Sequence, residues 1–468
     1  MNLSRRDFFG GALATSVMFS LSGCSAFRSN ARTYAANEKV RLAAIGIGCQ
    51  AWYDIQVLQE TGLCEIVALC DTDMGAKHTL PALKKYPSLP RYQDFRKMFD
   101  EMEDKIDAVL VGTPDHSHFA ACMHAMKCGK AVYVEKPLAN TFLQCELLAK
   151  AAKKYGVVTQ LGNQGHSGEN YWQYKAMYEK GMLRDVTKVV AHMNNQRRWH
   201  KWNGNVTGYP KKEAVPATLD WDSWLSVQPY HDYSKDFVIG EWRCWYDFGG
   251  GCMGDWGAHI IDTVHRFTLQ GDLPSEINIK NVSGWNPYVF PINNTVTFKF
   301  PKTAAHGDID LEWWEGVENQ PKVPKTYLYK TNKGLFPASS ANDGMIEPRL
   351  VPGKEIYTSN GVVWEGLSHS SPLMQIEGDK LDVPAFYDPK INHWKNFLLA
   401  VRGEDTANSP FSVGAPLCEI FALGCIAQRL NRNLKFDAKA KKFIGDDEAN
   451  LLLSGPAPRK GWECYYKV

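Results

Sequence analysis

The sequence has no marked excess of charge of one sign: 53 lysines and arginines stand against 51 aspartates and glutamates, a net charge of +2. This balance argues against a nucleic-acid partner, which calls for a strongly basic surface. The twelve cysteines contain no CxxC pair and no Cys/His spacing typical of a metal site, so we expect buried free thiols and no metal. No internal repeat or low-complexity tract is present. With 468 residues, 44% of them hydrophobic, the chain can hold two or three domains.

The first 24 residues predict an export signal and not a part of the fold. Residues 4–9 (SRRDFF) form a twin-arginine pattern, and the apolar run 10–21 is too short to span a bilayer as a mature helix. The run ends in LSGC, which resembles a bacterial lipobox, so we expect cleavage before Cys24 and a lipid anchor on that cysteine. An apolar leader that is cut elsewhere is the alternative. Residues 25–39 read as a tether, and the mature protein is expected in the periplasm or at the cell surface.

An apolar run followed by small residues opens the first folded part. The segment 41–51 (RLAAIGIGCQA) places Gly46, Gly48 and Ala51 at the spacing G-x-G-x-x-G/A, in which a buried strand turns sharply into a helix. The first glycine permits the turn, and the second lets the backbone approach a pyrophosphate. The small third residue lets the helix pack on the strand. On spacing alone, a tight turn that binds nothing is an equal alternative.

A second strand and an acidic residue favour a bound dinucleotide. Residues 65–70 (EIVALC) read as a strand, and Asp71 follows at once, 23 residues beyond Gly48. A dinucleotide fold places a carboxylate near this distance, where it binds the adenosine ribose hydroxyls. Because a carboxylate there repels a 2'-phosphate, we expect NAD and not NADP. Asp73 is an alternative residue for the same role.

Three further strand ends predict the rest of the cofactor cleft, because ligands of open α/β sheets gather at the carboxyl ends of the strands. The strand 108–111 is followed by GTPDHSH, the strand 131–134 by EKP and the strand 157–161 by GNQGH. Strands and helical segments alternate over residues 40–162, which predicts a doubly wound parallel sheet. The expected cofactor contacts are Thr113, Pro114, His118, Glu135, Lys136 and Asn163. For His116 and His118, a simple helix-start role is the alternative.

These motifs, in this order, resemble the glucose-fructose oxidoreductase / inositol dehydrogenase (Gfo/Idh/MocA) family. A second signature of that family follows downstream as GGGCMGDWGAHIID, residues 249–262. The resemblance implies an N-terminal Rossmann dinucleotide-binding domain and, over residues 163–468, an α+β substrate and oligomerisation domain with a large, open, mostly antiparallel sheet. It also implies catalytic roles for Lys136, Asp255 and His259, and a homo-oligomer.

The residue types support that mapping independently. Asp255 and His259 are four residues apart, so on a helix their side chains share one face. An imidazole oriented by a carboxylate is a plausible acceptor for the proton of a sugar hydroxyl, and the Lys136 ammonium is suited to stabilise the developing alkoxide. A helix-surface pair whose two members only satisfy each other is the alternative.

Tryptophans are unusually frequent and predict a sugar site. Eight of the fifteen lie between Trp172 and Trp256, mixed with arginines and other charged residues. Flat apolar rings bordered by charged groups suit a sugar, which has a C–H face and a hydroxyl rim. Most of these tryptophans are nevertheless expected in the core. The expected substrate contacts are Arg198, Trp199, Trp202, Trp242 and Arg243.

The function expected from these features is an NAD-dependent oxidoreductase acting on a sugar or glycoside hydroxyl. Twin-arginine export carries folded proteins, and free NAD is scarce outside the cytoplasm, so the NAD should be tightly held and recycled in the site. One alternative is an NAD-dependent glycoside hydrolase that oxidises C3, eliminates the aglycone, adds water and reduces the ketone again. A second alternative is a non-catalytic carbohydrate-binding lipoprotein.

Overall fold

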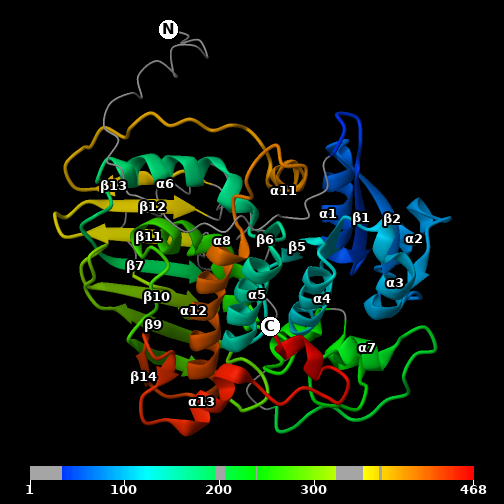
Figure 1. Cartoon of the computed structure of the whole chain (residues 1–468). Helices are drawn as coiled ribbons and strands as arrows, with labels where there is room; N and C mark the ends of the chain where they lie inside the picture. The colour runs from blue at the N-terminus through cyan, green and yellow to red at the C-terminus, as the bar shows by residue number, and fades with distance from the viewer. Residues whose placement is uncertain (1–33, 195–205, 239, 323–351, 368–370) are drawn as a thin grey trace, which may run out of the picture. The chain divides into compact units, whose positions relative to one another are not determined.

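Alternating apolar strands and helices build the first part of the chain into a parallel sheet (Figure 1). The computed structural model describes residues 34–194, 206–238, 240–322, 352–367 and 371–468. The six strands of this sheet lie in the order β3-β2-β1-β4-β5-β6, and every pair is parallel. They are β1 (Val40–Ile45), β2 (Cys64–Cys70), β3 (Arg91–Tyr92), β4 (Ala108–Val111), β5 (Ala131–Glu135) and β6 (Thr159–Gly162). The predicted doubly wound parallel sheet is confirmed.

The central strands are mostly apolar, as expected where helices cover both faces of the sheet. Every residue of β4 and of β5 is buried, as in parallel sheets generally. The helices of this part are α1 (Cys49–Glu60), α2 (Leu80–Lys85), α3 (Phe95–Met102), α4 (Asp115–Lys127) and α5 (Phe142–Tyr155). Local signals set their ends: the Thr141 side chain accepts from Gln144 N–H at the start of α5, and Gly156 ends that helix in the left-handed conformation.

The second part of the chain forms a larger mixed sheet, in which only β7 and β10 pair in parallel among the described residues. Its described strands lie in the order β13-β12-β11-β7-β10-β9-β8-β14-β15. Their bounds are β7 (Val186–Met193), β8 (Glu276–Ser283), β9 (Asn293–Phe300), β10 (Ile309–Glu315), β11 (Gly353–Thr358), β12 (Val363–Leu367), β13 (Met374–Glu377), β14 (Leu434–Asp437) and β15 (Lys442–Phe443). The predicted α+β domain with a mostly antiparallel sheet is confirmed.

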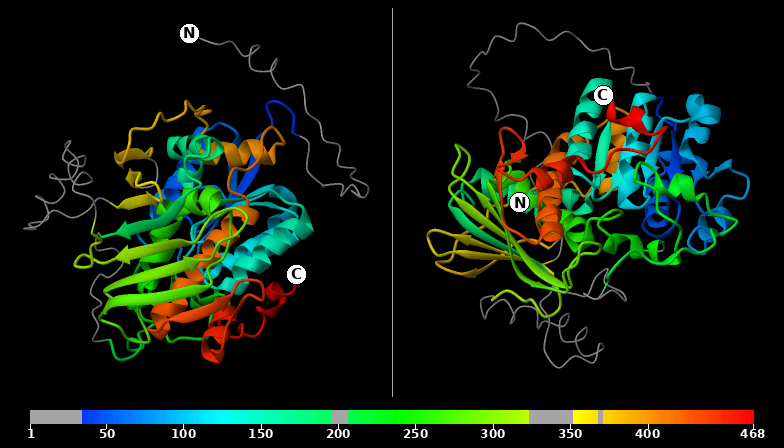
Figure 2. Two further views of the ribbon diagram at one scale, coloured as in Figure 1. Left: turned by 90° about the vertical axis from the view of Figure 1, so that its left-hand side faces the viewer. Right: turned by 90° about the horizontal axis from the view of Figure 1, so that it is seen from below.

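The helices of the second part connect this sheet to the first one. They are α6 (Glu169–Glu179), α7 (Trp221–Leu225), α8 (Gly251–Ile260), α11 (His393–Val401), α12 (Phe411–Leu430) and α13 (Asp447–Ser454). Helix α12 contacts α5 and β6 on one side and α8 and β9 on the other, which Figures 1 and 2 show from different directions. It is long and apolar enough to cross a membrane, but 78% of that stretch is buried, as expected of a core helix.

Three buried clusters hold the described residues together. The largest joins one face of the parallel sheet to the helix-covered face of the mixed sheet. The second fills the other face of the parallel sheet and includes Phe397 and Leu398 of α11. The third is rich in aromatic rings and contains Trp221, Trp224, Trp242 and Trp245. Residues 31–468 therefore form one compact unit.

Candidate active site

The glycine-rich turn after β1 is closed by contacts that leave no room for side chains. Gly46 has φ +84°, and a Cβ on it would lie 2.6 Å from the carbonyl oxygen of Gly112. A Cβ on Gly112 would lie 2.5 Å from the Cβ of Ala51. The turn after β1, the turn after β4 and the first turn of α1 therefore pack directly on one another. This packing accounts for the small residues at positions 46 and 51.

Asp71 lies beside this turn. Its Oδ2 accepts from Ile47 N–H at 3.1 Å, and its Oδ1 accepts from Asp73 N–H at 3.1 Å. Asp73 instead accepts from Gly75 N–H at 3.0 Å, within its own loop. Of the two acidic residues that the sequence offered for the adenosine ribose, Asp71 is thus the one joined to the glycine-rich turn.

His78 is a residue at this turn that the motif did not predict. Its ring lies so close to Gly48 that a Cβ on the glycine would lie 2.2 Å from His78 Cδ2. Gly48 precedes the first residue of α1, at the helix end where a pyrophosphate is expected. The loop before α2 thus adds an imidazole to the anion-binding end of α1, and no sequence signal marked it.

Two cations and two carboxylates meet where β5 ends and α8 begins. Lys136 Nζ donates to Asp255 Oδ1 at 3.0 Å, and Arg243 Nη1 lies 3.5 Å from the same oxygen. Arg243 Nη1 also donates to Asp115 Oδ1 at 3.3 Å. Lys136, Asp115 and Asp255 are all buried, so these ion pairs are held out of water. The structure brings the predicted Lys136 and Asp255 into direct contact.

Asp115 belongs to this cluster, although the sequence analysis did not assign it a role. Its Oδ2 accepts from Gly250 N–H at 3.1 Å, so it joins the loop after β4 to the glycine turn before α8. Burial raises the pKa of Asp115, and the Arg243 guanidinium opposes that rise. Asp115 lies within TPDHSH, the sequence that follows β4, which is the sequence feature that could have indicated its role.

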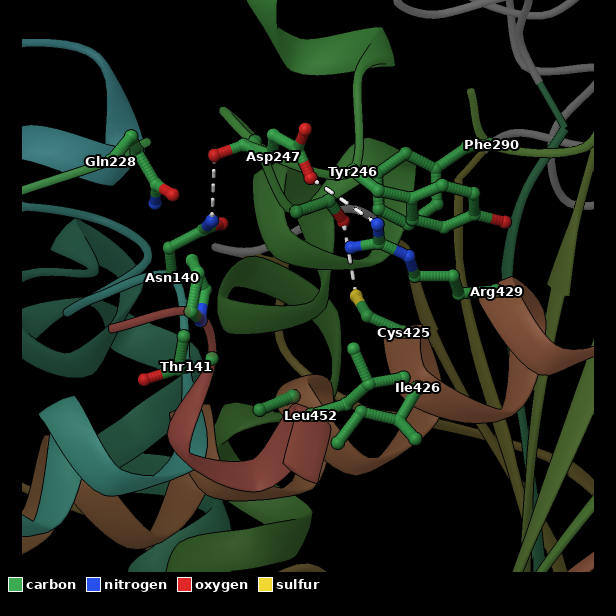
Figure 3. A pocket seen from close by; sticks show the side chains of 15 residues that line it. Asn140, Thr141, Gln228, Tyr246, Asp247, Phe290, Cys425, Ile426, Arg429 and Leu452 are labelled. Carbon is green, nitrogen blue, oxygen red and sulfur yellow. Dashed lines mark hydrogen bonds and ion pairs between the residues drawn. The ribbon is translucent and has the colours of Figure 1, made fainter. Parts of the chain in front are cut away.

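The third glycine of the GGG sequence fixes the start of α8. Gly251 has φ +59°, and a Cβ on it would lie 2.7 Å from the ring of Phe290. A cavity of about 70 Å³ lies behind this turn, and Figure 3 shows its lining. There Asp247 pairs with Arg429 at 3.3 Å, and Cys425 Sγ lies 3.5 Å from Gly250 O. These contacts support the turn that precedes α8.

His259 lies one helical turn beyond Asp255, on the same side of α8. It is half-buried, whereas Asp255 is buried, and its ring centroid lies 5.4 Å from that of Trp256. The three residues with predicted catalytic roles thus come from the end of β5 and from one face of one helix.

Three buried polar atoms without a hydrogen-bond partner lie in the residues that follow β4 and β6. They are Thr113 Oγ1 and both amide atoms of Asn163. Buried polar groups are normally hydrogen-bonded, so unpaired ones at two strand ends of one sheet edge indicate a polar ligand. Together with the glycine-rich turn, they fit a dinucleotide whose nicotinamide half lies near these strand ends.

His118 and Pro114 have structural contacts instead. His118 Nδ1 lies 2.8 Å from Pro137 O, and its Nε2 lies 2.8 Å from Thr113 O. The ring therefore ties the loop after β4 to the loop after β5, and both of its nitrogens are engaged. Pro114 is the residue that precedes α4.

Behind Lys136 lies a pair of buried carboxyl groups that the sequence did not reveal. Glu135 Oε2 lies 4.0 Å from Lys136 Nζ, and the Glu135 carboxylate is hydrogen-bonded to Asp54 of α1. Burial raises the pKa of both groups. Two carboxyl groups in contact need a shared proton, so the pair carries one negative charge beside the lysine.

The predicted substrate residues are only partly described. Arg198, Trp199 and Trp202 lie outside the described residues. Trp242 is buried in the aromatic cluster, where its ring lies 4.1 Å from the Arg243 guanidinium carbon. Trp242 therefore packs against Arg243 from one side, while the two carboxylates bind that guanidinium.

Comparison with known families identifies the architecture. Residues 40–163 match the model described as "Oxidoreductase family, NAD-binding Rossmann fold" of GFO_IDH_MocA, and residues 168–289 and 355–464 match the C-terminal alpha/beta domain of the same family. The chain belongs to the Gfo/Idh/MocA oxidoreductase family. The predicted family and the predicted NAD-binding Rossmann domain are confirmed.

Relatives with curated names resemble only part of the chain. It is 28% identical over 207 residues to "Alpha-N-acetylgalactosaminidase" of Shewanella oneidensis, which covers 39% of this chain and 44% of that protein. It is 29% identical over 172 residues to "Inositol 2-dehydrogenase" of Salmonella typhimurium, covering 36% of this chain and 48% of that protein. The chain thus matches less than half the length of each.

A solved structure shows the same fold. It is the WlbA dehydrogenase from Bordetella pertussis in complex with NADH and UDP-GlcNAcA, with a TM-score of 0.58 and 14% identity. The superposition covers 85% of this chain and 99% of that one.

Proposed function

We propose that this member of the family is an NAD-dependent oxidoreductase that oxidises a hydroxyl group of a sugar or glycoside. The observation that carries the proposal is the buried contact of Lys136 with Asp255, at 3.0 Å, at the same sheet edge as the unpaired polar atoms of Thr113 and Asn163. A purely structural fold would gain nothing from burying both a cation and unpaired polar groups at one sheet edge.

NAD supplies a nicotinamide ring that accepts hydride when it is bound. The chain's own residues bind, orient and deprotonate the sugar. Lys136 is placed to donate a hydrogen bond to the reacting hydroxyl oxygen and to stabilise the negative charge that develops there. His259 takes the hydroxyl proton, and Asp255 holds the lysine and sets the charge of the site. Arg243 adds a second cation and is itself fixed by Asp115 and Asp255.

We also propose that the protein is exported and anchored through a lipid on Cys24, on the evidence of the SRRDFF and LSGC sequences. NAD is then tightly held and returned to its oxidised form within each cycle, and the chain forms a homo-oligomer. The anchor is tested by growing cells that express the wild type or Cys24→Ala with radiolabelled palmitate and comparing the label incorporated into the two proteins. Equal labelling of the two proteins contradicts it.

The activity is tested on the purified full chain. After extensive dialysis, we expect stoichiometric NAD in the denatured supernatant, and NADH fluorescence on adding a substrate sugar. Lys136→Ala should retain NAD and lose the fluorescence change. Lys150→Ala is the matched control, because that side chain is 62% exposed and far from any assigned role. The absence of NAD would favour the alternative of a non-catalytic carbohydrate-binding lipoprotein. The joint presence of Lys136, Asp255 and His259 argues against that alternative.

The second candidate function is NAD-dependent glycoside hydrolysis. The similarity to "Alpha-N-acetylgalactosaminidase" and to "Glycosyl hydrolase family 109 protein 1", each at 28% identity, favours it. A chromogenic glycoside separates the two functions. Release of the aglycone without an external electron acceptor indicates hydrolysis, whereas a ketosugar product indicates oxidation alone.

A further inference from the structure

A buried imidazole–carboxylate pair lies beyond the cluster of Lys136, Arg243, Asp115 and Asp255. His166 Nδ1 lies 2.8 Å from Oδ1 and 2.9 Å from Oδ2 of Asp262, and both residues are buried. A carboxylate at Nδ1 holds the proton on that nitrogen and leaves Nε2 as the basic one. His166 Nε2 is buried and has no hydrogen-bond partner. The proposed hydroxyl oxidation uses neither residue.

The pair lies on the same helix face as the predicted catalytic residues. Helical hydrogen bonding continues past α8, with Ile261 N–H donating to Gly257 O at 2.8 Å and His265 N–H to Ile261 O at 2.9 Å. Asp262 therefore follows Asp255 by two turns, a rise of about 10 Å, and follows His259 by less than one turn. The helix then widens into a π-turn over Val264–Thr268. Such turns are frequent at functional sites.

His166 reaches this helix face from the cofactor edge of the parallel sheet. It lies in the short 3-10 helix Gln164–Ser167, directly after β6 and three residues beyond Asn163, whose amide has no partner. The pair thus joins the end of β6, the neighbour of β5 in the parallel sheet, to the helical turn that follows α8. This placement puts it at the same edge of the parallel sheet as the cluster around Lys136.

Charged and imidazole groups surround the pair of His166 and Asp262. Lys354 of β11 is buried, and its charge interacts with that of Asp262. Burial lowers the pKa of Lys354 to about 8, and Asp262 opposes the shift. Of the nearby imidazoles, His393 is fully bonded, to Ser167 Oγ and Leu161 O at 2.7 Å each. His265 has an unpaired Nε2 and is the rival base.

We infer that His166, oriented by Asp262, is a second proton-transfer site that acts on the carbon next to the oxidised carbon of the sugar. This inference rests on the proposed function, because only a ketosugar has an acidic proton at that position. The C–H bond breaks and its proton goes to His166 Nε2. The electron pair forms a carbon–carbon double bond, and the carbonyl oxygen becomes an enolate oxygen, which the Lys136 and Arg243 cations stabilise. Where the carbon beyond it carries an aglycone, the enolate oxygen re-forms the carbonyl and a double bond forms between the deprotonated carbon and that next carbon. The C–O bond to the aglycone breaks, and its electrons leave with the aglycone oxygen, which takes a proton from solvent.

The test supplies the ketosugar directly, so it does not depend on the oxidation step. The holoenzyme is incubated with a 3-ketoglucoside in D2O, and deuterium at C2 is followed by NMR. We expect the wild type to catalyse exchange, and His166→Asn, which keeps a donor for Asp262, to lower the rate at least about 100-fold. Asp262→Asn should lower it less, because the base remains. Wild-type-like exchange in His166→Asn, or no catalysed exchange in the wild type, overturns the inference.

Matched variants separate this role from loss of the fold. His306→Asn removes another buried histidine, whose Nε2 contacts Asp272 at 3.1 Å, and should leave exchange unchanged. His265→Asn should also retain the exchange activity. If exchange is lost in His265→Asn and kept in His166→Asn, the base is His265 and the inference is overturned. If the His166→Asn variant loses bound NAD, the His166→Gln variant is used in the exchange assay in its place. Failure of the proposed function is seen separately, as no NADH fluorescence when the wild type is given the unoxidised sugar.

Discussion

Lys136 Nζ and Asp255 Oδ1 lie 3.0 Å apart, although 119 positions separate the two residues in the chain. The contact exists because β5 ends where α8 begins, and because Asp115 and the GGG turn hold that junction closed. Asp255 is the nearer counter-charge of Lys136, and the carboxyl pair of Glu135 and Asp54 is a second one, with Glu135 Oε2 4.0 Å from Nζ. Removing Asp255 leaves the buried ammonium with only this more distant negative charge, which is costly.

Asp255→Asn should therefore abolish most of the hydride transfer while keeping the shape of the side chain. We expect the rate of NADH formation to fall at least about 100-fold. The unfolding free energy should fall by up to about 3 kcal/mol, because the buried Lys136 keeps only the more distant charge of the Glu135–Asp54 pair. Stopped-flow fluorescence and urea unfolding measure the two effects. Asp379→Asn, at an exposed position, is the control, and equal losses in both variants contradict the assignment.

Asp71→Asn should weaken NAD retention and relax the discrimination against a 2'-phosphate. The carboxylate accepts from Ile47 N–H in the glycine-rich turn, so its loss changes both the charge and the turn. We expect the affinity for NADP relative to NAD to rise at least about tenfold, measured by calorimetry on the stripped protein. Asp73→Asn is the control, since the Asp73 carboxylate accepts from Gly75 N–H within its own loop. A larger effect at Asp73 would transfer the role to it.

The parts of this site that the sequence predicted are those encoded within one short segment. Gly46, Gly48 and Ala51 define a turn through their own spacing, and EKP and GGGxxxD each place a functional group at the end or start of an element. The strand pattern likewise predicted the parallel sheet, because buried strands are continuous apolar runs.

The residues that the sequence missed owe their roles to tertiary contacts. Asp54 meets Glu135 only because α1 packs beside the end of β5, and His78 meets Gly48 across a loop. Asp262 and His166 are 96 positions apart. For Trp242, the neighbouring charges in the sequence suggested a sugar contact. In the structure its ring packs within the aromatic cluster and against Arg243.

Gly46→Ala should destabilise the protein far more than Gly62→Ala does. Both glycines have positive φ, +84° and +74°, but a Cβ on Gly46 would lie 2.6 Å from Gly112 O, whereas nothing lies within 4 Å of one on Gly62. Gly62→Ala therefore measures the backbone cost alone, about 1 kcal/mol. We expect Gly46→Ala to cost at least about 2 kcal/mol more and to lose NAD, because the turn must open. Similar unfolding midpoints for the two variants would show that the turn is not closely packed.

The buried Glu315 should make the protein less stable as the pH rises. Burial raises the pKa of Glu315 from 4.5 to about 7, although Trp313 Nε1–H donates to it at 2.7 Å and Gln428 Nε2–H at 3.1 Å. The folded pKa lies above the unfolded one, so the folded state binds the proton more tightly. The stabilisation is complete below pH 4.5 and is lost as the pH rises to about 7.

At about 1.4 kcal/mol per pKa unit, this loss amounts to about 3 kcal/mol. Glu315→Gln does not titrate, so its disadvantage relative to the wild type should shrink between pH 5 and pH 8 by that amount. Urea unfolding at the two pH values measures the change, with Glu377→Gln as an exposed control. Glu315 accepts through both carboxylate oxygens, so the amide loses one bond and is expected to be the less stable protein at pH 5. A difference between wild type and Glu315→Gln that is the same at both pH values would mean that Glu315 is ionised throughout.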